Sequence, residues 1–136
     1  MSITEFPIET STFPDQYALD ELSAVFAQPS IYWTYPGPVG EVSGGVRLYL
    51  QLNGQITNVH ASCGTAPDSG NVVVDVFKNG STVYTTALDR PAVGASGVDE
   101  STPNVTSVLA GDYLEIHVVD AGTLAEDLVV RIDLGP

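Results

Sequence analysis

The chain has 136 residues, enough for one domain, and carries 17 acidic but only four basic side chains, a formal charge of −13 at pH 7. Binding to phosphate backbones requires clustered Lys and Arg, so this charge argues against nucleic acid and anionic membranes as partners. Residues 1–20 hold no apolar run of signal-peptide length, and no stretch approaches the roughly 20 apolar residues of a membrane-spanning helix. We therefore expect a soluble protein made without a secretion signal.

The chain contains a single cysteine, Cys63, which cannot form a disulfide within the chain. We expect it to be a small buried apolar residue, and an intracellular folding environment is the simpler inference. Strong negative charge keeps a protein soluble at high local concentration through self-repulsion, which suits an abundant surface component.

Residues 1–30 differ in composition from the rest, with five acidic residues and no basic one. Phe6-Pro7 and Phe13-Pro14 recur seven residues apart, and proline biases both itself and the preceding residue toward extended backbone. The sequence therefore predicts an extended N-terminal arm over residues 1–30. A short helix within residues 15–26 is compatible with the spacing of its apolar side chains, and Pro29 would end it.

The first strands are expected from residue 31 onward, where β-branched and aromatic residues begin. Residues 31–35 form such a run, closed by Pro36-Gly37-Pro38. In residues 46–52 the even positions are apolar, and Asn53-Gly54 predicts a hairpin turn into residues 55–61. The inward set of the first strand of this hairpin is Val46, Leu48, Leu50 and Leu52. In the second strand the apolar phase shifts between Ile56 and Val59, which indicates a β-bulge.

A second hairpin is predicted over residues 72–88, after a loop at residues 63–70. Its turn is Asn79-Gly80, the strongest short-range signal for a type I′ turn, in which both central residues need φ > 0. Val72, Val74 and Val76 share one face of the first strand. In the second strand Val83 and Thr85 alternate with Tyr84 and Thr86.

The remaining segments are a long loop, a short strand and a final pair of long strands. Residues 90–103 are interrupted by Pro91, Gly94 and Gly97 and predict the loop, and residues 105–109 predict the short strand. Gly111-Asp112 turns into a strand at residues 113–120, and a turn around Gly122 precedes the last strand at residues 128–134. Their inward sets are Leu114, Ile116 and Val118, then Leu128, Val130, Ile132 and Leu134.

These seven or eight strands, each with one apolar face, predict an all-β fold. Two sheets packed face to face give every strand one buried and one wet side, so we expect residues 31–136 to form an antiparallel β-sandwich, jelly-roll-like. A closed five-stranded barrel is the alternative. The expected core includes Leu48, Leu50, Val74, Val76, Leu114, Ile116, Val130 and Ile132.

Residue types that carry chemistry are sparse. A zinc site would need His60 and His117 on one face of neighbouring strands, with Glu115 or Asp75 as a third ligand, so half-exposed histidines are the simpler expectation. The acidic pairs Asp99-Glu100 and Glu126-Asp127 lie in predicted loops, where solvated surface is a commoner outcome than calcium binding. No Gly-x-Ser-x-Gly nucleophile motif occurs. We expect no cofactor, no metal and no enzymatic activity.

The aromatic residues indicate an interface. Seven of the eleven lie in the first 35 residues, where regular structure is least expected. Aromatic side chains outside a core often anchor partners, because they supply large contact area at low entropic cost. The predicted partner-binding residues are Phe6, Pro7, Phe13, Pro14, Tyr17, Phe26, Tyr32 and Trp33. The alternative is that this segment folds back on its own sandwich.

Three segments carry a resemblance to known proteins: KNGSTVYTT at residues 78–86, AGDYLEIHV at residues 110–118 and DLVVRIDL at residues 127–134. Together they resemble a β-sandwich domain of tailed-bacteriophage virion proteins, found in head decoration proteins, head fibres and minor tail proteins. The resemblance spans about residues 45–136 and implies no catalytic residues. It implies a homo-oligomer, with a trimer favoured, whose partners are the major capsid protein or other virion subunits.

Three functions are therefore open. The first is a non-enzymatic decoration (cement) protein on the outer surface of a phage head, made in the host cytoplasm. The second is a tail or fibre module that binds host-cell carbohydrate, with Trp33, Tyr35, Tyr49 and Tyr84 as candidate stacking residues. The third is a free-standing bacterial or archaeal β module whose acidity reflects a salty cytoplasm.

Overall fold

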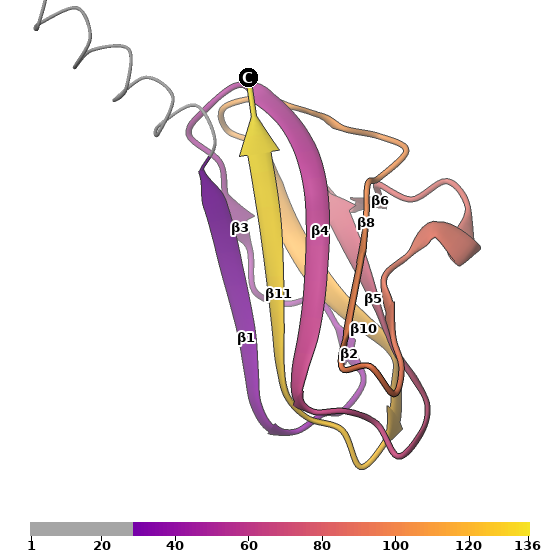
Figure 1. Cartoon of the computed structure of the whole chain (residues 1–136). Coiled ribbons are helices and arrows are strands. Elements are labelled where there is room, and N and C mark those ends of the chain that lie inside the picture. Colours follow the sequence, from indigo (N-terminus) through magenta and orange to yellow (C-terminus); the bar gives the residue numbers. More distant parts are fainter. Residues whose placement is uncertain (1–28) are drawn as a thin grey trace, which may run out of the picture.

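The computed structural model describes residues 29–136, which fold as two antiparallel sheets packed face to face (Figure 1). The first sheet has the order β1 (Ser30–Pro38), β11 (Glu126–Gly135), β4 (Gly54–Thr65) and β8 (Val98–Ser101), and β9 (Ser107–Val108) also pairs with β4. The second has the order β2 (Val42–Ser43), β10 (Tyr113–Thr123), β5 (Ser69–Lys78) and β6 (Ser81–Thr82), with β3 (Leu48–Tyr49) on β10 and β7 (Ala92–Val93) on β5. A 3-10 turn, η1 (Ala87–Asp89), follows β6.

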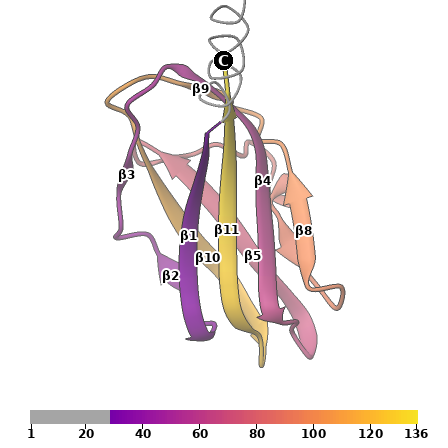
Figure 2. The same ribbon diagram turned by 60° about the vertical axis from the view of Figure 1, so that its left-hand side comes forward.

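The strand order is that of a jelly roll, so the predicted sandwich is confirmed and the closed barrel is wrong. The chain passes between the sheets repeatedly: β1 lies in the first, β2 and β3 in the second, β4 in the first, β5 to β7 in the second, β8 and β9 in the first, β10 in the second and β11 in the first. Figure 2 shows β1, β11, β4 and β8 side by side in front of β10 and β5. Apart from the β5–β6 hairpin, the partners of the long strands come from distant parts of the chain, as in a double Greek key.

The core lies between the sheets and follows the predicted alternation closely. The predicted inward residues of β5, β10 and β11 are buried, and Leu50 joins them. Leu48 is only partly buried and packs against the edge of this core. The fully buried predicted residues on these strands are Val72, Val74, Val76, Leu114, Ile116, Val118, Leu128, Val130 and Ile132.

The Asn79-Gly80 turn is confirmed, but the strand that follows it is shorter than predicted. Asn79 and Gly80 have φ of 52° and 90°, as a type I′ turn requires. β6 then ends after two residues, and Val83 and Tyr84 are both buried, so the predicted alternation over residues 83–86 is wrong. The N–H of Val83 still donates to the Val76 carbonyl on β5, but the Val83 carbonyl accepts the backbone N–H groups of the distant Asn104 and Val105, so the ladder to β5 ends there.

The predicted hairpin at Asn53-Gly54 is wrong. β3 pairs with β10 in the second sheet, whereas β4 begins at Gly54 in the first, so the two segments never pair. Glycine is needed at position 54 because a Cβ there would overlap the carbonyl oxygen of Gly135 on β11, and not because of a positive φ. Val46 and Leu52, assigned to the inward set, are 56% and 54% exposed.

The predicted bulge in β4 is confirmed. Asn58 pairs with Asp133 and Ile56 with Leu134, so Thr57 is the extra residue that lets Ile56 and Val59 both face the core. Two predicted loops are partly wrong, because β4 continues to Thr65 and residues 90–103 contain β7 and β8. The predicted short strand at residues 105–109 is present as β9. Of the predicted arm, only residues 29 and 30 fall within the described residues.

Candidate functional site

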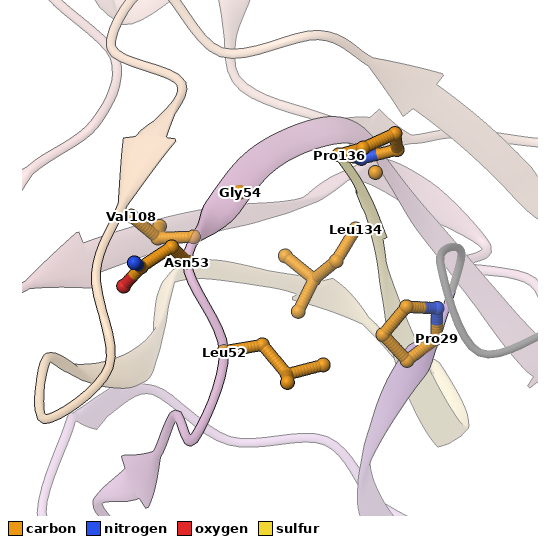
Figure 3. Close-up of a pocket in the computed structure, with 8 residues that line it drawn as sticks. Pro29, Leu52, Asn53, Gly54, Val108, Leu134 and Pro136 are labelled. Carbon is orange, nitrogen blue, oxygen red and sulfur yellow. The ribbon is translucent and has the colours of Figure 1, made fainter. Parts of the chain in front are cut away.

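An apolar hollow opens at the end of the sandwich where the described chain begins, and we call it the arm-end pocket (Figure 3). It has a volume of about 180 Å³. Figure 3 shows Leu52 and Leu134 directed into the same space, with Pro29 beside them. The lining residues are Pro29, Leu52, Asn53, Gly54, Val108, Leu134, Gly135 and Pro136. A second hollow of about 350 Å³ adjoins it along Pro29, Leu52 and Leu134.

Backbone contacts between distant segments build this pocket. The N–H of Leu134 donates to the carbonyl of Pro29 at 2.9 Å, which fixes where the chain enters β1. Close contact of Gly54 with Gly135 brings the start of β4 against the end of β11. The backbone N–H of Ala110 donates to Asn53 Oδ1 at 2.8 Å, which holds the segment that carries Leu52. Leu52 is therefore kept at the mouth of the pocket although half of it is exposed.

The chemistry of the arm-end pocket is that of an apolar receptor. Among the residues that line it, none carries an ionisable side chain, and Asn53 already accepts a backbone hydrogen bond. Such a surface gains free energy when its apolar area is covered, and its side chains carry no charge that would attract an ionic ligand. Sequence reasoning missed this pocket, since it treated Leu52 as a core residue of a hairpin that does not form.

A second feature lies on the outward face of the second sheet, where aromatic and polar side chains from β3, β10 and β5 gather. The rings of Tyr49 and Tyr113 are 5.6 Å apart, and the guanidinium of Arg47 lies 4.3 Å from the Tyr113 ring centre. Farther along the sheet, Phe77 stacks on His117 at 3.9 Å. Tyr49 is 62% exposed, so this face presents one open aromatic ring beside charged side chains.

Asp75, on the same outward face, is buried and paired. It is 4% exposed, and its carboxylate accepts the hydroxyl of Thr82 at 2.5 Å and lies 3.5 Å from the guanidinium of Arg90. The pairing ties β6 and the segment after η1 onto β5. A buried carboxylate with two partners is accounted for by the fold and needs no catalytic explanation.

Tyr84 is buried beneath the same segment. Its hydroxyl accepts a hydrogen bond from Ser101 at 3.0 Å, and burial raises the pKa of Tyr84 to about 12. Tyr84 is therefore a core residue and is wrong as a candidate for stacking on a glycan. Burial also raises the pKa of the half-buried Cys63 thiol, which disfavours the reactive thiolate.

The predicted partner-binding residues divide between the arm and β1. Phe6, Pro7, Phe13, Pro14, Tyr17 and Phe26 lie outside the described residues. Tyr32 is 62% exposed on the outer face of the first sheet. Trp33 points to the opposite side and packs against the core with Tyr35, their rings 6.0 Å apart.

The structure does not bring the two histidines together. His60 is on β4 in the first sheet and His117 on β10 in the second. They therefore cannot share a zinc site, which would need both on one face of neighbouring strands. Within residues 29–136, no three His, Cys, Asp or Glu side chains gather as a metal site. The prediction that both acidic pairs lie in loops is wrong, since Asp99 and Glu100 are on β8 and Glu126 and Asp127 begin β11. Three of these carboxylates accept hydrogen bonds: Asp99 from the backbone of Ala92, Glu100 from Asn58 and Asp127 from the backbone of Gly37.

Comparison with known proteins identified no family: no family model, curated protein or solved structure matches the chain. In the part of the chain that the structure describes, no helix is long and apolar enough to cross a membrane.

Proposed function

We propose that the chain is a non-enzymatic virion structural protein, most specifically a decoration (cement) protein on the outer surface of a phage head. The observation that carries the proposal is the division of the chain into a jelly roll and a preceding segment with two Phe-Pro units, and an apolar pocket lies beside Pro29, where the described chain begins. A self-sufficient domain with an attachment segment is what a protein needs when it is added to a finished surface.

Charge and composition support this proposal. A net charge of −13 keeps the protein soluble at the high local concentration of a particle surface. The arm, acidic and without a basic residue, favours a partner groove that offers Lys or Arg. The proposed partner is the major capsid protein or another virion subunit, and copies assemble on the particle as a homo-oligomer, with a trimer favoured.

The anchors of the arm are Phe6 and Phe13, which stand up to roughly 23 Å apart in an extended chain. Each ring contributes about 1.5–3 kcal/mol when fully buried in a partner, and the prolines lower the entropy lost on docking. Because the arm is acidic, attachment weakens as salt rises.

The test is attachment to particles that lack the protein, followed by sedimentation. Deleting residues 1–14 is expected to abolish attachment and to leave the melting temperature of the isolated protein nearly unchanged. The double variant Phe6→Ala, Phe13→Ala should behave in the same way, while Leu88→Ala, at a 93% exposed position of η1, serves as a matched control. Full attachment by the truncated protein, or its easy unfolding, contradicts the proposal.

A second candidate function is a tail or fibre module that binds host-cell carbohydrate. The observation that favours it is the exposed Tyr49 ring next to Tyr113, over which Arg47 lies, because sugars stack on open aromatic rings flanked by polar groups. A glycan array and whole-cell adsorption test it. Binding that disappears in Tyr49→Ala but survives deletion of residues 1–14 supports the glycan module over the decoration protein.

A further inference from the structure

We infer that the arm-end pocket is a receptor for the protein's own chain, and that the side chain of Phe26 occupies it. The inference concerns the isolated protein and does not depend on the proposed virion function. It rests on three observations: where the described chain begins, what the pocket can hold, and which side chains can reach it.

The chain enters the sandwich at the rim of the pocket. Pro29, the first described residue, lines both adjoining hollows, and its carbonyl is fixed by the N–H of Leu134. Phe26 is three residues earlier, so its Cα lies at most about 11 Å from that of Pro29. Phe26 is also the only aromatic residue in the segment 18–28. The tether therefore places this ring at an effective concentration in the millimolar range at the mouth of the pocket.

The pocket suits a phenyl ring in size and chemistry. Its volume is about 180 Å³, and an apolar protein cavity of about 150 Å³ is enough to hold benzene. Leu52 and Leu134 supply apolar walls, and Leu52 is left 54% exposed by the described residues. A docked ring would cover this leucine without burying a charged side chain of the lining.

The occupant is a segment of the same chain and not of a second copy, because of charge and tethering. Phe26 is tethered three residues from Pro29, whereas a second copy must be recruited from solution against the repulsion between two chains of charge −13. The other arm rings are farther away along the chain, Phe13 by 16 residues from Pro29. Docking of Phe26 would fix where the arm leaves the sandwich and leave residues 1–25 available to a partner.

A double-mutant cycle in the full-length protein tests the contact. Phe26→Ala is expected to lower the folding equilibrium constant about tenfold or more, which corresponds to partial burial of one ring. In a Leu52→Ala background the same substitution should have a clearly smaller effect, since the partner surface is gone. The matched control is Leu88→Ala, at an exposed leucine on η1 far from the pocket along the chain. In that background Phe26→Ala should lower the folding equilibrium constant by the same factor as in the parent protein.

The occupant is identified by nuclear Overhauser contacts. A contact between the ring protons of Phe26 and the methyl groups of Leu52 within one labelled copy is the expected result. The same contact appearing only between differently labelled copies, together with stability that rises with protein concentration, overturns the inference in favour of a second copy. A Phe26→Ala variant as stable as the parent, or effects that simply multiply in the Leu52→Ala background, also overturns it. Particle attachment, which depends on Phe6 and Phe13, is measured separately.

Discussion

Replacing Asp75 with alanine should destabilise the protein by about 2–4 kcal/mol, although the change lowers the negative charge. The bond from the Thr82 hydroxyl to the buried carboxylate is charge-assisted, and such bonds contribute about 1.5–3 kcal/mol. The pair with Arg90 adds less than about 1 kcal/mol, because the Arg90 side chain is 23% exposed and screened by water. Most of the loss should therefore come from the contact with Thr82.

The assay is urea unfolding at pH 7 of the full-length protein and four variants, Asp75→Ala among them. Asp75→Asn keeps an oxygen that accepts from Thr82, so it should be destabilised less than Asp75→Ala. Arg90→Ala should lose about 1 kcal/mol or less. Glu126→Ala, an exposed acid on β11, controls for the relief of charge repulsion in a protein of charge −13. If Asp75→Ala is no more destabilising than Glu126→Ala, the carboxylate does not tie β6 and η1 to β5.

Three further predictions concern the core, a buried hydroxyl and a backbone contact. Val74→Asp should lower stability by at least about 3 kcal/mol in thermal unfolding, because it buries an unpaired charge, and Val119→Asp at an exposed position of β10 should not. Burial raises the pKa of Tyr84 from 10 to about 12, so its neutral form stabilises the fold below pH 10 and that stabilisation is lost as the pH rises from 10 to 12. In Tyr84→Phe the free energy of unfolding, measured by urea titration, should fall less between pH 10 and pH 12. An equal fall in the variant and the parent contradicts the assignment. Gly54→Ala should be destabilised by about 1–3 kcal/mol through its overlap with the Gly135 carbonyl, whereas Gly94→Ala meets only the movable amide of Asn71 and should be tolerated; equal unfolding midpoints for the two would refute this.

Local patterns in the sequence determined a large part of the fold. Strict alternation in β10 and β11 identified their buried faces, because side chains of a strand point to opposite sides with a period of two. The Asn79-Gly80 turn was readable because two adjacent residues at positive φ need these residue types. The bulge at Thr57 was readable because it changes the phase of the apolar residues within one strand.

Tertiary structure decided everything that depends on which strands meet. β3 pairs with β10 in the second sheet and β4 with β11 in the first. The same Asn-Gly signal therefore marks a turn at residue 79 but a close backbone contact, with Gly135 of β11, at residue 54. The segment 90–103 became β7 and β8 only because β5 and β4 offer open edges to it. Burial of Asp75 and the arm-end pocket arise in the same way, from segments distant in sequence. A pattern confined to one strand cannot encode such contacts, since each requires a partner whose position is set by the topology of the whole domain.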